Sequence, residues 1–391
     1  GLNGLQLIEW GTHDRTFEPA SEPPDLLAQL RQRYGPHPVD HCDRHGENDA
    51  GYERLLAGLL HGADQKTRIV LDLMEREDWD LLSCAYGETH CTGHQFWHFQ
   101  DPSHPWYRAD APEALRSAIE TVYRRVDEGL GRLITAAGAD ADVLVIASHG
   151  MARAIKGTQL LPEVLARLGL GSGGGAGISS RLRRVQSIIS HAPEAARPFL
   201  KWLASTRGVK AIQRRSGALF DPLEAPETRA VALRNNRCGA IRLNLKGREP
   251  YGGVEPGAEA SALVADIRRA LLDLRHPDSG EAIVERVVTA AEAFGPDHHP
   301  DVPDVLVVFR QDLGPLERCV SDRVGRIHVP MYHPDYPRTG DHTPETRLWW
   351  LRGDGQPAPE RRQGHVLDIA PTVLKLLGVD AVADADGRAL V

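Results

Sequence analysis

The 391-residue sequence predicts an α/β protein with a parallel sheet flanked by helices. Two observations predict this fold. Short uninterrupted apolar runs, typical of strands buried on both faces, alternate with longer stretches whose apolar residues recur at helical spacing. Polar segments that contain histidine directly follow two of the predicted strands, which is where ligands bind in open parallel sheets.

The first part of the chain has a strand–helix–strand order. Apolar residues at helical spacing in residues 55–74 predict one long helix or two short ones. The apolar run 79–86 predicts a buried strand, and residues 114–135 predict an amphipathic helix. The run 142–147 then predicts a second buried strand, which completes a unit typical of parallel sheets.

The last part of the chain repeats the same signals. Runs 304–309 and 348–351 predict buried strands, and residues 366–377 predict a closing helix that ends before Gly378. We therefore expect the α/β core to occupy residues 1–170 and 236–391.

A different composition separates these two parts of the core. The glycine-rich stretch 171–177 precedes residues 178–215, which contain nine Arg or Lys residues and one acidic residue. We expect a basic helical insertion or cap over residues 171–235. A solvated insertion, a cap that attracts an anionic substrate and a patch for a partner or membrane surface all remain open.

The composition excludes several classes of protein. No apolar stretch is long enough for a membrane span, and the net charge of -8 gives no general footprint for a nucleic acid polymer. Five scattered cysteines without a CxxC pair argue against a disulfide framework and favour a reducing, cytoplasmic compartment. The sequence leaves the oligomeric state open, with a homodimer among the alternatives.

Histidines provide the strongest chemical signal. His90 and His94 are four residues apart, so a helix would place both rings on one face as half of a zinc site, and the alternative is a structural or coincidental pair. His149 follows the second strand and could ligate a metal, act as a base or cap a helix. Ser148 beside it is a poor candidate nucleophile, because neighbours on an extended chain point in opposite directions.

Two further loops offer polar side chains. The loop before the 348–351 run contains Arg338, Asp341 and His342, where His342 is a candidate ligand and Asp341 could orient an imidazole. The segment 244–250 offers Lys246 and Arg248 as clamps for phosphate or carboxylate, or as exposed charges on a turn.

In this order the motifs resemble the type I phosphodiesterase/nucleotide pyrophosphatase branch of the alkaline phosphatase superfamily. That branch carries an E-x-D-x-x-G-H segment, an S-D-H-G-M strand end and a G-x-H loop. Here they correspond to residues 88–94, 147–151 and 340–342. Segments 244–250 and 367–373 are also similar to the family.

The resemblance implies an alkaline-phosphatase-like fold, with a doubly wound, mostly parallel sheet that has helices on both faces. It also implies a two-zinc site that cleaves phosphoric esters through a Thr or Ser nucleophile. It assigns His94 and His342 to one metal and His149 to the other. The sequence departs from the family pattern because His90 and Ser148 stand where the family has Asp. The segment that begins at Leu2 resembles the part of the family that comes after the nucleophile, so we expect the nucleophile upstream of Gly1.

These observations predict a phosphodiesterase-like or phosphatase-like hydrolase, or a transferase derived from one, that acts on a small anionic phosphate or sulfate ester. We expect catalytic roles for Glu88 and His149. We also expect at most one tightly bound zinc, or a site without metal, because Ser148 is a weak substitute for a carboxylate. The alternative is a noncatalytic protein that binds a phosphorylated ligand or a protein partner. The remaining candidate residues are the metal ligands His90, His94 and His342 and the substrate-binding residues Lys246, Arg248, Arg338 and Asp341.

Overall fold

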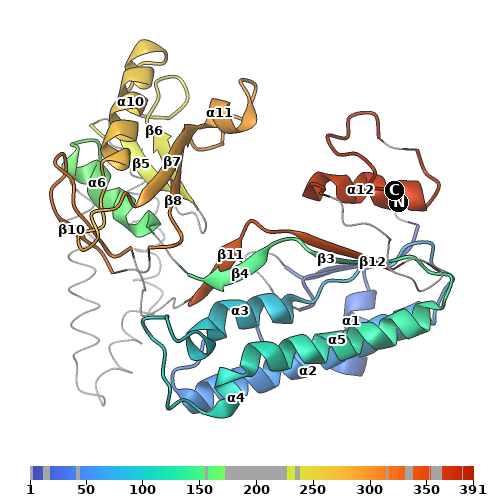
Figure 1. Ribbon diagram of the computed structural model, residues 1–391. Coiled ribbons are helices and arrows are strands. Elements are labelled where there is room, and N and C mark those ends of the chain that lie inside the picture. Colours follow the sequence, from blue (N-terminus) through green and yellow to red (C-terminus); the bar gives the residue numbers. More distant parts are fainter. Residues whose placement is uncertain are drawn as a thin grey trace, which may run out of the picture. The chain divides into compact units, whose positions relative to one another are not determined.

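The computed structural model describes residues 3–11, 18–40, 45–154, 157–171, 227–233, 238–313, 316–330, 338–351, 353, 363–380 and 382–391. This part of the chain is mixed α/β and forms two compact units (Figure 1). Unit 1 comprises Gly1–Ala154 together with Tyr332–Val391, and unit 2 comprises Ile155–Met331. The predicted basic segment 178–215 lies outside the described residues.

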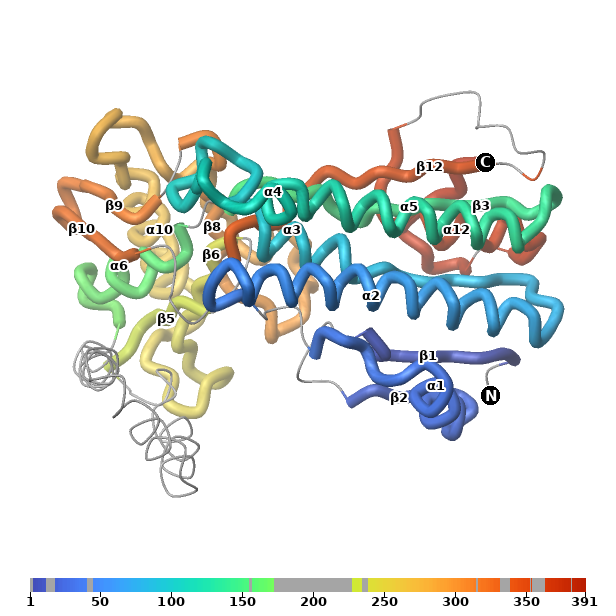
Figure 2. The backbone as a smooth tube through the Cα atoms, turned by 90° about the horizontal axis from the view of Figure 1, so that it is seen from below, coloured from blue at the N-terminus to red at the C-terminus, as the bar shows by residue number. Residues whose placement is uncertain are grey.

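Three helices form the body of unit 1. They are α2 (Asp49–Met74), α3 (Gly87–Gln100) and α5 (Ala118–Ala137), and the short α4 (Glu113–Arg116) precedes α5. Helices α2 and α5 run side by side (Figure 2). Leu55, Leu59, Phe96 and Val122 are buried between these helices, which confirms the helices predicted from apolar spacing.

The remaining elements of unit 1 are short. The segments β1 (Gln6–Ile8), β2 (Ala20–Glu22) and α1 (Leu26–Tyr34) begin the unit, and η3 (Val366–Asp368) with α12 (Ile369–Leu376) ends it. Gly378 follows α12 with a φ of 69°, a left-handed conformation that suits a glycine after a helix.

Two antiparallel ribbons join distant parts of unit 1. Strand β3 (Val143–Ala147) pairs with β12 (Arg347–Leu351), and β4 (Gly150–Arg153) pairs with β11 (Gly340–Thr343). Strands are therefore present where they were predicted at 142–147 and 348–351, but the predicted burial is wrong, since neither strand has a buried residue and Ile146 and Trp349 are 42% and 55% exposed.

Unit 2 contains a four-stranded antiparallel sheet with the strand order β5-β6-β8-β7. Its strands are β5 (Ala230–Leu233), β6 (Gly239–Leu243), β7 (Val284–Thr289) and β8 (Val305–Phe309). The core of the unit includes Ile241, Ile267 and Val307. The other elements are η1 (Thr158–Leu160), α6 (Leu161–Arg167), α10 (Ala258–Leu272), α11 (Ala290–Phe294), β9 (Arg318–Cys319) and β10 (Ile327–His328).

Two expectations about the sheet are wrong for the described residues. Every pairing between named strands there is antiparallel, so these residues form no central parallel sheet. The run 79–86 is not a buried strand, because none of the described strands pairs with it and Leu81 and Leu82 are 55% and 40% exposed. An apolar run alone does not specify a strand, since a strand also needs a neighbour to accept and donate its backbone hydrogen bonds.

Candidate metal centre

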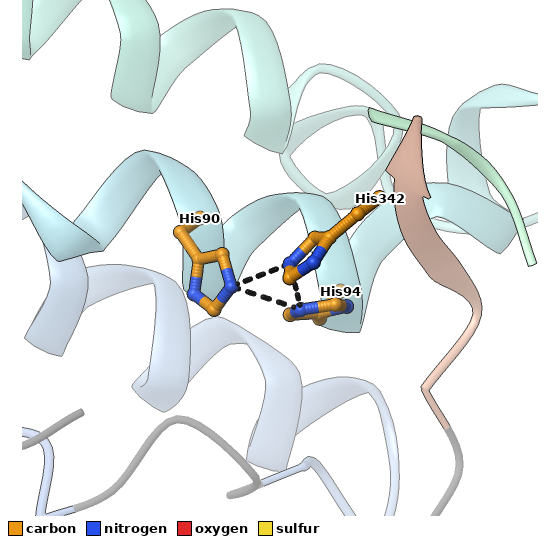
Figure 3. Close-up of side chains that lie close together, drawn as sticks. All are labelled: His90, His94 and His342. Atoms are coloured by element: carbon orange, nitrogen blue, oxygen red, sulfur yellow. Dashed lines mark hydrogen bonds between the residues drawn. The ribbon is translucent and has the colours of Figure 1, made fainter. Parts of the chain in front are cut away.

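Three histidines of unit 1 converge at one point. The Nε2 atoms of His90 and His342 lie 2.8 Å apart, and the Nε2 atom of His94 lies 3.1 Å from each of them. Figure 3 shows the three rings directed toward one another, two from α3 and one from β11. The predicted convergence of these residues is confirmed.

Local structure explains why these side chains meet. His90 and His94 are one turn apart on α3, so they share a face of the helix. His342 lies on β11, directly opposite Met151 of β4. Met151 in turn lies beside α3, because a Cβ on Gly93 would come within 2.7 Å of its terminal carbon. The β4–β11 ribbon therefore presents His342 to the histidine face of α3.

The environment of His94 favours a neutral ring with a free ligand atom. Its Nδ1 lies 2.7 Å from the Gly340 carbonyl, which can only accept, so Nδ1 carries the proton and Nε2 keeps its lone pair. Burial lowers the pKa of His94 to about 2, and the nearby charge of Arg338 contributes to the same shift. A bond from the second ring nitrogen to a carbonyl is typical of metal-ligating histidines.

The donor set fits a divalent ion such as zinc. Ligand atoms of His90, His94 and His342 all lie within 4.8 Å of one another. Two nitrogens bound to one tetrahedral zinc at about 2.0–2.1 Å would be about 3.3 Å apart, so the rings need to separate by only a few tenths of an ångström. Three imidazoles leave a fourth position open, as in catalytic rather than structural zinc sites.

His149 lies against this cluster but is not part of it. Its ring stacks on that of His342 with centroids 3.8 Å apart, and its Nδ1 lies 3.0 Å from the Gly150 carbonyl. Among the described residues, no other group of three ligating side chains surrounds it. Ser148 is exposed and contributes its carbonyl to a hydrogen bond from Thr346.

Glu88 is held at the beginning of α3 by two basic side chains. Its carboxylate lies 3.0 Å from the Lys66 Nζ and 3.0 Å from the His37 Nε2, and only 2% of its side chain is exposed. The contacts with His37 and Lys66 lower the pKa of Glu88 and outweigh the effect of burial. The structure therefore connects Glu88 to α2 and to the loop at His37, and the catalytic role predicted for it stays a prediction.

The two polar residues before His342 are both buried. Arg338 is 9% exposed, and its charge acts on His94. Asp341 is 4% exposed and accepts a hydrogen bond from the backbone N–H of His342 at 2.9 Å. This contact of Asp341 is to the backbone, whereas the sequence suggested a contact to an imidazole.

Lys246 and Arg248 lie in unit 2, where both contact carboxylates. Arg248 forms two bonds of 2.7 Å with Asp304, and it also donates to Glu249 and to the Leu243 carbonyl. Lys246 pairs with Glu255. These contacts hold the turn after β6, and the role in substrate binding stays a prediction.

The residues that hold the histidine helix in place were not found from the sequence. Lys66 and His37 contact Glu88 across 22 and 51 residues, and Thr339 contacts His94 across 245 residues. His37 and Lys66 lie outside the motifs, and Thr339 lies in the polar loop before the 348–351 run but was assigned no role there. A local signal for the contact between α3 and β11 was the pair of glycines near the histidines. Gly93 precedes His94, Gly340 lies two residues before His342, and the two glycines meet where α3 and β11 touch.

The histidine cluster is suited to a metal-dependent hydrolase, and comparison with known families narrows the class. The family model for type I phosphodiesterase / nucleotide pyrophosphatase matches residues 34–318, which is most of the chain. The chain therefore belongs to the type I phosphodiesterase / nucleotide pyrophosphatase family, a family of phosphodiester hydrolases. No curated protein and no solved structure matches the chain. The matched residues include His90, His94 and His149. His342 lies outside the matched range, and the fold brings it next to His90 and His94.

Proposed function

We propose that this protein is a metal-dependent hydrolase of a small anionic phosphate or sulfate ester, or a transferase derived from such an enzyme. The convergence of the His90, His94 and His342 Nε2 atoms within 3.1 Å carries this proposal. Family membership supports an ester as the substrate. The described helices include none that is long and apolar enough to cross a membrane.

These three histidines would hold one ion, with zinc as the best match to a nitrogen donor set. A zinc ion bound there would supply Lewis-acid chemistry at an ester oxygen. The side chains around the site would do the remaining work. The charge of Arg338 acts on His94, so Arg338 is the candidate for attracting an anionic ester to this position.

We assign proton transfer to His149, whose ring lies against His342 without belonging to the three-histidine cluster. An imidazole there can accept a proton from an attacking group or return one to the leaving group. We assign Asp341 to orienting the His342 backbone and Glu88 to fixing the beginning of α3, in keeping with their hydrogen bonds.

A nitrophenyl phosphodiester assay on the protein, with and without added zinc, tests the proposal. Activity should require the metal and should fall at least about 100-fold in His94→Ala, while Glu120→Gln on the exposed face of α5 should leave it unchanged. A protein that binds zinc through the three histidines but hydrolyses no phosphate or sulfate ester would contradict the proposal.

One observation favours a second candidate function. His90 and Ser148 occupy positions where the family pattern has acidic ligands, so the site has fewer negative charges than the pattern implies. A noncatalytic protein that binds a phosphorylated ligand would fit this loss. Calorimetric binding of a phosphate ester without turnover would identify it.

A further inference from the structure

Thr339 lies where three elements of unit 1 meet. It is completely buried and precedes β11 directly. Its backbone carbonyl accepts from the Ala154 N–H at the end of β4 at 2.9 Å, and its backbone N–H donates to the His94 carbonyl on α3 at 2.8 Å. The residue therefore links the β4–β11 ribbon to the middle of the histidine helix.

The hydroxyl of Thr339 strengthens this link. Its Oγ1 lies 3.2 Å from the His94 carbonyl, 3.3 Å from the His98 backbone N–H and 3.1 Å from the His98 Nδ1. A hydroxyl has one proton and two lone pairs, so it can donate to the carbonyl and accept from both nitrogens of His98. The carbonyl of His94 and the N–H of His98 are the two groups that an α-helix pairs across one turn, so the hydroxyl bridges that turn.

The position of Thr339 determines the position of two groups in the metal centre. The next residue, Gly340, supplies the carbonyl that accepts from His94 Nδ1 at 2.7 Å. His342 follows two residues later and brings its Nε2 to within 3.1 Å of the His94 Nε2. A shift of Thr339 along α3 would therefore move both the Gly340 carbonyl, which sets the tautomer of His94, and the ring of His342.

We propose that Thr339 is a positioning residue for the three-histidine site and that its hydroxyl fixes β11 in register with α3. This inference rests on the proposed function, since it concerns the same three histidines. Thr339 would not contact the ion or the substrate, and it acts through His94, Gly340 and His342. Because a methyl group cannot bridge the turn, shape alone does not replace the hydroxyl.

Two substitutions separate the hydroxyl from the shape of the side chain. Thr339→Val keeps the branched shape and removes the hydroxyl, whereas Thr339→Ser keeps the hydroxyl and removes the methyl group. Thr92→Val is the matched control. Thr92 is as buried as Thr339, but it lies on α3 itself, and its hydroxyl donates within that helix to the Glu88 carbonyl at 2.7 Å.

The first measurement uses metal-free protein and needs no activity. Imidazole ¹⁵N shifts should show a single Nδ1–H tautomer for His94 in the wild type, in Thr339→Ser and in Thr92→Val. In Thr339→Val the tautomers should mix, and the backbone amide of His98 should exchange with solvent at least about 10-fold faster, as expected for the loss of about 1.4 kcal/mol of local stability. Unchanged His94 shifts and His98 exchange in a folded Thr339→Val would overturn the inference.

The second measurement is a zinc titration with a competing chelator. The dissociation constant for zinc should be at least about 10-fold higher in Thr339→Val than in the wild type. In Thr339→Ser it should stay within about 3-fold of the wild-type value. Equal weakening in Thr339→Val and Thr92→Val would assign the effect to general stability and would also overturn the inference. If the wild type binds no zinc, the proposed function fails, while the metal-free measurement still decides the role of Thr339.

Discussion

The rings of His149 and His342 stack with their planes inclined by 25° and their centroids 3.8 Å apart. The ring of His149 also lies 5.5 Å from that of His90, but His149 is not one of the three histidines whose ligand atoms converge. The family resemblance assigns His149 to a second metal, and its sequence neighbour Ser148 replaces the carboxylate that would share that metal. We therefore propose proton transfer, rather than metal binding, as the role of His149.

We therefore expect at most one tightly bound divalent ion per chain. His94→Ala should remove it, whereas Ser148→Ala should leave the metal content unchanged because a hydroxyl is a poor zinc ligand. Elemental analysis after dialysis against a weak chelator measures the metal content of the wild type and of both variants. Two equivalents of zinc in the wild type after this treatment would contradict the prediction.

Gly340→Ala should weaken both the fold and the metal site. A Cβ at this position would lie 2.1 Å from the Gly93 carbonyl oxygen and 3.1 Å from the Trp97 Cβ, so β11 would have to move away from α3. Forced movement of this kind costs about 1–3 kcal/mol in the free energy of unfolding. Urea denaturation and zinc affinity measure the two effects.

Gly131→Ala provides the control for that substitution. Gly131 lies on α5, and a Cβ added there would meet no neighbouring side chain within 4 Å, so alanine should stabilise the helix by about 0.5–1 kcal/mol. An equal loss of stability in both variants would show that the contact between α3 and β11 is not the cause.

The buried pair formed by Lys66 and Glu88 should behave as a unit. Lys66→Met would leave the Glu88 carboxylate without its lysine partner, and Glu88→Gln would leave Lys66 without the carboxylate, so each should cost about 3–5 kcal/mol. The double variant should lose less than the sum. A double-mutant cycle on unfolding measures the coupling, and Glu120→Gln in the exposed pair with Arg124 should change stability by less than about 0.5 kcal/mol. Additive losses would show that Lys66 and Glu88 do not interact.

Acid should destabilise unit 1 before its carboxylates titrate. Burial lowers the pKa of His98 to about 3 and that of His104 to about 4, below the unfolded value of about 6.5. The unfolded chain therefore binds more protons, and stability that is fully present above about pH 6.5 is lost as the pH falls toward these values. Each histidine contributes a slope of about 1.4 kcal/mol per pH unit.

Urea denaturation of metal-free protein between about pH 6.5 and pH 4.5 isolates this effect, because most carboxylates titrate lower. His104→Gln should reduce the slope by the contribution of one histidine. A slope that is the same in the variant, or stability that increases toward acid, would be inconsistent with neutral buried rings.

Local patterns in the sequence predicted the helices and the histidine pair well. Spacing on α3 was enough to place His90 and His94 on one face, and the order of motifs added His342. The hydrogen bonds of Thr339 and the ion pair of Lys66 were not predictable, because the motif beside Thr339 brings His342 near α3 without specifying these contacts, and nothing near Lys66 in sequence points to Glu88. The run 79–86 was misassigned for the same reason, since its apolar composition says nothing about whether a neighbouring strand pairs with it.

The metal centre also has a consequence for biosynthesis. His90 and His342 are separated by 252 residues, and all of unit 2 lies between them in the chain. During translation, α2, α3 and α5 leave the ribosome long before β11 exists, so the nascent chain presents only part of the ligand set. Closing such a long loop is slow compared with forming helices. An ion held by all three histidines would therefore bind only after β11 has been made.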